Sequence, residues 1–174
     1  MKGTGQQGIG LIEVAVSLLV ISVATLGLVR TQLAAREAAF NALQRGEVVA
    51  YMESLTELVR SNAVGALQYR ADDIEGIPRP TANCTTQYCP DSYWGEWNLW
   101  QWQQDLSGWR VSAPSGVVTD SLFNPQACVR IDQHRVTVDM YWAAPGAEAP
   151  RPACDQVAPP RWHRLSLSSR IGEV

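Results

Sequence analysis

Apolar residues dominate the start of the chain. Residues 9–29 contain no Lys or Arg, and their only formal charge is Glu13. A run of this kind has the length that a helix needs to cross the hydrocarbon core of a bilayer, about 20 residues. A carboxylate in that core is costly, by roughly 2.5–3.5 kcal/mol at the helix centre and by less near an edge. We therefore expect a membrane-spanning helix in which Glu13 either has a specific partner or lies among the headgroups.

Beyond Arg30 the pattern becomes periodic, with charged residues between regularly spaced apolar ones. This spacing is typical of an amphipathic helix whose apolar stripe packs on a globular head. The stripe consists of Leu33, Phe40, Leu43, Val48, Met52, Leu55 and Val59. Because the first proline is Pro78, we expect one continuous helix over residues 9–61, with Gly65 as its stop signal.

The remaining segments predict a small α+β head. Turn residues fill residues 65–95, and residues 96–106 have the spacing of a short helix that ends at Gly108. Strand patterns occupy residues 117–123, 128–131, 135–142 and 162–171. Alternation of apolar and polar side chains in the third of these is typical of a half-buried strand. We expect a long N-terminal helix packed on a small antiparallel sheet, with a hairpin turn at residues 132–134 and a loop over residues 143–160.

The chain has four cysteines, all beyond the apolar run: Cys84, Cys89, Cys128 and Cys154. An even number of cysteines in an exported head indicates two disulfides, and three pairings are possible. We favour Cys84–Cys89, because it is local, and Cys128–Cys154, because it would clip a long loop to a strand. A zinc site is disfavoured, since the sulfurs are spread out without a CxxC.

Composition argues against several classes of function. The net charge of −3, without a stripe of Lys and Arg, argues against nucleic-acid binding. Asp72, Asp73 and Glu75 before Gly76 do not have EF-hand spacing and are interpreted as a solvated acidic turn. No serine has a nucleophile-elbow context and no motif places a carboxylate pair, so we expect no enzyme activity, no cofactor and no metal.

Five of the seven tryptophans fall in residues 94–109. Three of them, Trp94, Trp97 and Trp100, are three residues apart and can share one helical face. They form either part of the core of the head or an exposed patch for a partner subunit, because Trp is enriched at binding hot spots. A head of this size cannot easily bury all five, so we expect at least one to be exposed.

The segment before the apolar run carries a further signal. A polar leader of residues 1–8 ends in Gly8 directly before Ile9, and Glu13 is the fifth residue of the chain that begins at Ile9. This arrangement resembles the type IV pilins and the pseudopilins of type II secretion. The resemblance implies that a prepilin peptidase cleaves between Gly8 and Ile9, that Ile9 becomes N-methylated, and that Glu13 acts in filament assembly. Ile9 and Gly10 stand where the family usually has Phe and often Thr.

Further segments resemble minor pilins of the PilV type: Val29-Arg30-Thr31-Gln32-Leu33, Asn41-Ala42, Arg60-Ser61-Asn62, Asp105-Leu106 with Trp109, and Val136-Thr137-Val138 with Trp142. The resemblance implies a low-abundance subunit that primes pilus assembly or caps the tip. Its expected partners are other minor pilins, the major pilin and a tip adhesin. The expected location is the inner membrane, single-pass with a periplasmic head, and then the filament. The expected parts are a leader (1–8), a membrane half (9–29) and an amphipathic half (30–64) of the helix, and a head (65–174).

Two alternatives remain open. A minor pseudopilin of type II secretion shares the leader and the helix, and the genomic neighbourhood would distinguish the two. A signal-anchored periplasmic binding protein or enzyme would need a pocket with converging polar groups and no processing at Gly8.

Overall fold

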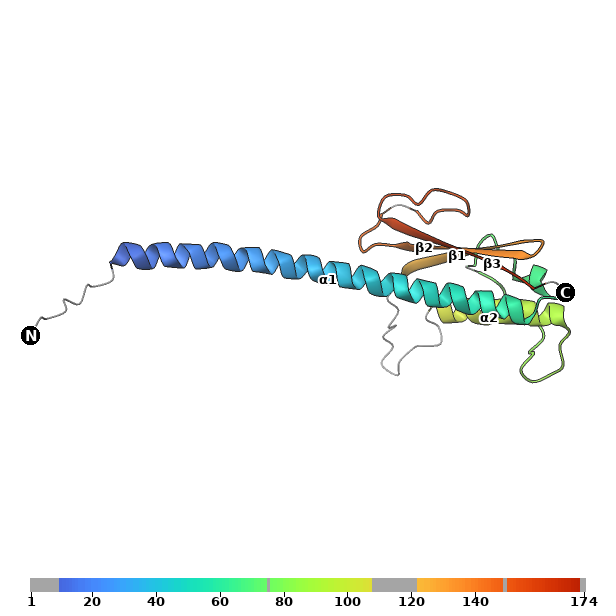
Figure 1. Ribbon diagram of the computed structural model, residues 1–174. Coiled ribbons are helices and arrows are strands. Elements are labelled where there is room, and N and C mark those ends of the chain that lie inside the picture. Colours follow the sequence, from blue (N-terminus) through green and yellow to red (C-terminus); the bar gives the residue numbers. More distant parts are fainter. Residues whose placement is uncertain (1–9, 75, 108–121, 149, 173–174) are drawn as a thin grey trace, which may run out of the picture. The chain divides into compact units, whose positions relative to one another are not determined.

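The computed structural model describes residues 10–74, 76–107, 122–148 and 150–172 of the chain. It divides into two compact units between Leu43 and Gln44, here called the N-terminal unit and the head unit. Figure 1 shows the elements in chain order. They are α1 (Leu11–Ser61), η1 (Ala66–Tyr69), α2 (Asp91–Leu106), β1 (Phe123–Asp132), β2 (Arg135–Ala143) and β3 (Trp162–Arg170). The architecture is α+β, with a long N-terminal apolar helix and a small antiparallel sheet, as the sequence predicts.

Helix α1 is continuous from Leu11 to Ser61. Its first turn contains Glu13 and its last turn contains Arg60, so each end carries the charge that the helix dipole favours. The helix ends close to the predicted residue, before a 3₁₀ turn whose N-cap is Gly65.

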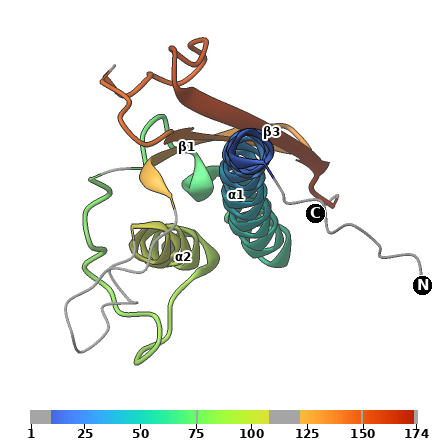
Figure 2. The same ribbon diagram turned by 90° about the vertical axis from the view of Figure 1, so that its left-hand side faces the viewer.

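The core of the head unit lies between the sheet and the two helices (Figure 2). Helix α1 contributes four fully buried side chains at helical spacing, Val48, Met52, Leu55 and Val59. They pack with Val136, Val138 and Met140 of β2 and with Leu99, Trp102 and Leu106 of α2. Burial of four such side chains on one face fixes which side of the helix meets the sheet.

The predicted apolar stripe of α1 is wrong in its first part. Leu33 is 60 % exposed and Leu43 is 70 % exposed, and Phe40 is only partly buried. The first buried side chain of the helix is Gln44, where the head unit begins. Periodicity marks an apolar face but does not say how far along the helix a compact unit covers it.

The sheet has the order β1-β2-β3 and is antiparallel throughout. The β1–β2 hairpin turns at Gln133 and His134, within the predicted turn, and Gln133 has a φ of 47°. Strand β1 begins at Phe123, with an irregularity in register before Gln126, so the end of the predicted 117–123 strand is the start of β1. Residues 117–121 lie outside the described residues.

Strand β2 is buried on both faces, which corrects the expectation of a half-buried strand. Val136, Val138, Met140 and Trp142 face the main core, as predicted. On the other face Asp139 and Tyr141 are also 0 % exposed. The segment between β2 and β3 packs there, contributing Ala147, Cys154 and Ala158 to a second cluster around Tyr141. A loop that the sequence marks only as rich in Ala and Pro therefore forms a layer.

Helix α2 begins at Asp91 rather than at residue 96, directly after Pro90. Proline is tolerated before a helix because the missing N–H has no intrahelical partner there. The predicted end at residue 106 is confirmed, and Gly108 lies outside the described residues. A Cβ atom on Gly95 would lie 2.7 Å from Cβ of Gln68 and 3.0 Å from the carbonyl oxygen of Gly65. The absence of a side chain lets α2 approach the η1 segment closely.

Candidate functional site

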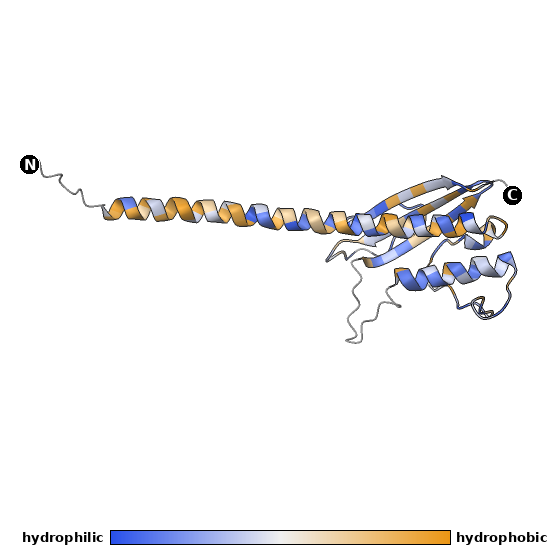
Figure 3. Cartoon of the chain, turned by 60° about the horizontal axis from the view of Figure 1, so that its bottom comes forward, coloured by the Kyte–Doolittle hydropathy of each residue, from blue (hydrophilic) through white to orange (hydrophobic). Residues whose placement is uncertain are grey.

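The N-terminal part of α1 presents apolar side chains without any covering layer. Residues 11–39 are exposed throughout, and Leu11 and Ile12 are 92 % and 78 % exposed. Figure 3 shows the run of hydrophobic residues along this part of the helix. Among the described residues, α1 is the one helix long and apolar enough to cross a membrane. Soluble monomers rarely expose apolar patches larger than a few hundred Å², so this surface needs lipid or protein around it.

Glu13 lies in the first turn of α1, at the start of this apolar surface. Its backbone N–H donates to the carbonyl oxygen of Gly10 at 2.9 Å, and its own carbonyl accepts the Ser17 hydroxyl at 2.7 Å. Its side chain is exposed and forms no ion pair with any residue that the structure describes. Gly8 and Ile9, the predicted cleavage and methylation sites, lie outside the described residues, so both remain predictions.

The other polar side chains in the apolar part of α1 are satisfied within the helix. The hydroxyls of Ser17, Ser22 and Thr25 each donate to a carbonyl oxygen three or four residues earlier, at 2.7–2.9 Å. Such bonds let a hydroxyl enter lipid without an unsatisfied donor. Glu13 therefore differs from its neighbours, because its carboxylate has no donor within the described helix.

The tryptophans of α2 divide between two clusters. Trp97 is 3 % exposed and packs against the Cys84–Cys89 disulfide, with Trp94 and Trp100 partly buried around it. The ring centroids of Trp97 and Trp100 lie 5.2 Å apart, and the Arg79 guanidinium lies over Trp100. Of the three residues considered as a partner interface, Trp97 is thus a core residue, whereas Trp94 and Trp100 keep some exposed surface.

Two further tryptophans complete the group. Trp102 belongs to the main core, and its indole N–H donates to the carbonyl oxygen of Tyr51 at 3.0 Å. Trp109 lies outside the described residues. The expectation that the group contributes to the core therefore holds for Trp97 and Trp102.

Both disulfides are present, with the pairing that the sequence favoured. Cys84–Cys89 closes a short loop before α2, and Cys128–Cys154 ties the segment between β2 and β3 to β1. The second bridge closes a separation of 26 residues. In the loop-entropy description, a bridge of this kind stabilises a fold by about 2–4 kcal/mol.

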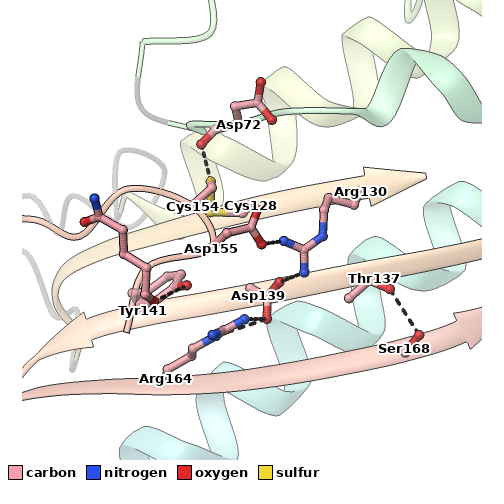
Figure 4. Close-up of polar contacts among 11 residues, drawn as sticks. Asp72, Cys128, Arg130, Thr137, Asp139, Tyr141, Cys154, Asp155, Arg164 and Ser168 are labelled. Atoms are coloured by element: carbon pink, nitrogen blue, oxygen red, sulfur yellow. Dashed lines mark hydrogen bonds and ion pairs between the residues drawn. A yellow bond between two sulfur atoms is a disulfide. The ribbon is translucent and has the colours of Figure 1, made fainter. Parts of the chain in front are cut away.

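A buried ion-pair network on the outer face of the sheet was not predicted from the sequence (Figure 4). Asp139 of β2 is 0 % exposed and pairs with Arg130 of β1 and with Arg164 of β3, the latter at 2.9 Å. Arg130 also pairs with Asp155 in the segment between β2 and β3. Strand alternation places Asp139 on the face opposite Val138, but only the sheet register brings arginines from two other strands beside it.

This network is balanced in charge, with two arginines and two aspartates. The hydrogen bond to Asp139 raises the pKa of the Arg164 guanidinium above its usual value. Burial raises the pKa of the neighbouring Tyr141 hydroxyl, which donates to the carbonyl oxygen of Gln156 at 3.1 Å. With its charges paired, the network fastens the loop layer to the sheet and leaves no net charge for a ligand.

The other predicted candidates do not converge on one place. Among the described residues, no group of three or more His, Cys, Asp or Glu side chains could hold a metal ion. Asp72 and Asp73 are exposed, and Glu75 lies outside the described residues. His134 is in the β1–β2 turn, and the ring of His163 lies 5.2 Å from that of Trp142. The apolar part of α1 with Glu13 is therefore the strongest candidate for a functional site.

Comparisons with protein-family models, with curated proteins and with solved structures found no match to this chain.

Proposed function

We propose that this chain is a minor pilin, which primes the assembly of a type IV pilus or caps its tip. The observation that carries the proposal is the isolated carboxylate of Glu13 at the start of an uncovered apolar helix. A charge in this position needs a partner, and residues of this kind in membrane helices are functional by default.

The physical logic connects Glu13 to the leader. Cleavage between Gly8 and Ile9 would create a cationic amine at the end of the same apolar helix. In a filament, the carboxylate of one subunit pairs with the amine of its neighbour. Burial of either charge alone is unfavourable, so pairing offsets the cost and fixes the axial register of the two helices. The membrane stores the subunit before assembly, and the head unit carries contacts to other minor pilins and to an adhesin.

A minor pseudopilin of a type II secretion system is the nearest alternative, because it would use the same helix in the same way. The two are distinguished by the machine with which the mature chain co-purifies, either pilin and adhesin or secretin and secretion ATPase. A periplasmic binding protein or enzyme would instead use the head alone and would tolerate changes at Glu13.

The proposal is tested by measuring the mature N-terminus and the incorporation of Glu13 variants into sheared pili. We expect a mature mass that begins at methylated Ile9. Glu13→Gln should lower incorporation roughly tenfold or more, because an uncompensated buried charge costs several kcal/mol and each 1.4 kcal/mol is a factor of about ten. Glu53→Gln is the matched control, since Glu53 is an exposed acid of the same helix within the head unit. It should leave incorporation unchanged.

Two outcomes would contradict the proposal. One is a mature chain that retains Met1 or begins near Ala24. The other is a Glu13→Gln or Glu13→Ala variant that enters pili as efficiently as the native chain while its level in the membrane is unchanged.

A further inference from the structure

The segment between η1 and α2 carries two exposed tyrosines beside a hollow. Tyr88 is 92 % exposed and Tyr93 is 46 % exposed, and both line a hollow of about 390 Å³. This volume lies in the range typical of small-molecule sites, about 300–1,000 Å³. We infer that the hollow is a binding site for a neutral saccharide. This inference concerns the head unit alone and does not depend on the proposed role of Glu13.

The backbone around the hollow is held in place before any ligand binds. The Cys84–Cys89 disulfide closes the loop, and Trp97 packs against it from the core side. Within the loop, the carbonyl oxygen of Asn83 accepts the N–H groups of Thr86 and Gln87, both at 3.2 Å. A site with a fixed backbone loses less conformational entropy on binding than a flexible loop does. A shallow site can therefore bind with few contacts.

The lining of the hollow determines the class of ligand. Besides the two tyrosines it consists of Thr81, Ala82, Gln87, Cys89 and Pro90, none of which carries a charge. Phosphates, carboxylates and cations would find no compensating charge there, and leaving their water without one is unfavourable. A neutral ligand with several polar groups remains.

A sugar ring has the two kinds of surface that this lining offers. Its C–H faces can pack on aromatic rings, and tyrosine supplies a large amphipathic surface with few torsions to immobilise. Its hydroxyls can bond the Gln87 amide, which offers both donors and an acceptor, and the hydroxyls of Thr81 and the tyrosines. An apolar drug-like ligand would bury too little surface in an open hollow, whereas a saccharide remains partly hydrated when bound.

The inference is tested with the mature full-length chain in a detergent that has no sugar headgroup. Saturation-transfer NMR is recorded with lactose, maltotetraose and chitotriose as neutral probes, and with sialyllactose as an anionic one. We expect at least one neutral probe to bind at millimolar concentration or below. Tyr88→Ala and Tyr93→Ala should each weaken that binding about tenfold, which corresponds to about 1.4 kcal/mol. Gln87→Leu should also weaken it, and Tyr88→Phe should keep most of it.

Phe123→Ala is the matched control, because Phe123 is an aromatic residue of β1 with the same 46 % exposure as Tyr93 but does not line the hollow. It should leave binding unchanged. Near-ultraviolet circular dichroism and the mass of the disulfide-bonded chain establish that each variant is folded.

Three results would overturn the inference. The first is the absence of saturation transfer with every neutral probe. The second is equal affinity in the native chain and in all of the Tyr88→Ala, Tyr93→Ala and Gln87→Leu variants. The third is preference for sialyllactose over lactose, which would require a charge that the hollow lacks. If the tyrosine variants instead impair recovery with other subunits and no sugar binds, the hollow is a protein-docking surface.

Discussion

Asp139 shows how one residue can join three strands and a loop. Its carboxylate is fully buried, yet both guanidinium groups beside it remain about a third exposed, at 37 % and 34 %. Arg130 in turn holds Asp155 of the segment between β2 and β3. The burial of the acid is tolerated because two positive partners replace its water, and breaking such an arrangement on one side leaves charges without compensation.

At this scale we predict that Asp139→Asn lowers the free energy of unfolding by about 1.5–3 kcal/mol, the range for hydrogen bonds to charged groups. Partial exposure of both arginines keeps the effect below that of a fully buried pair. Asp155→Asn is the control, because the Asp155 side chain is 69 % exposed and exposed pairs contribute at most about 1 kcal/mol. Urea unfolding of the oxidised chain measures both, and equal effects would show that burial of Asp139 does not matter.

Helix α2 is positioned by the absence of a side chain rather than by its sequence pattern. At Gly95 the helix passes close to Gly65 and Gln68, and the atoms in the way are a backbone oxygen and a Cβ, neither of which can move freely. This contact sets the approach of α2 to η1 and thereby the position of Leu99 and Trp102 in the core.

For the elements we predict that Gly95→Ala destabilises the head by about 1–3 kcal/mol, the usual cost of overpacking, even though alanine favours a helix. Gly46→Ala is the matched substitution in α1, where a Cβ would meet nothing within 4 Å. It should stabilise the fold by up to about 1 kcal/mol. Thermal unfolding would contradict this interpretation if the two variants shifted the midpoint in the same direction.

For the whole molecule, the division between Leu43 and Gln44 separates two different ways of stabilising one helix. In the N-terminal unit the side chains of α1 are exposed and need an external apolar environment. In the head unit the same helix contributes fully buried side chains to a closed core. The second half of α1 is therefore as much a part of the head as the sheet is.

We predict that a secreted chain beginning at residue 44 folds cooperatively with both disulfides, whereas one beginning at residue 62 does not. The shorter chain loses Val48, Met52, Leu55 and Val59, all 0 % exposed. Truncation of each costs about 2–5 kcal/mol, and together they exceed the typical total stability of about 5–15 kcal/mol. A cooperative transition in near-ultraviolet circular dichroism for the shorter chain would show that the head does not need α1.

Much of the fold could be predicted from local patterns. The continuous helix to Ser61, the end of α2 and the β1–β2 hairpin follow from periodicity and turn residues, because these signals act between near neighbours in the chain. The position of Glu13 within an apolar run is likewise visible in the sequence alone. The hollow at Tyr88 and Tyr93 was missed, because exposure of an aromatic ring has no sequence signal.

The sequence by itself determined the apolar helix with its single acid, the α+β order of elements and the favoured cysteine pairing, since each depends on local spacing or on simple counting. Tertiary structure alone decided that Leu33 and Leu43 stay exposed, that β2 is covered on both faces and that Asp139 meets two arginines. The physical reason is that these features depend on register and layer contacts between residues far apart in the chain, for which hydrophobic periodicity carries no information.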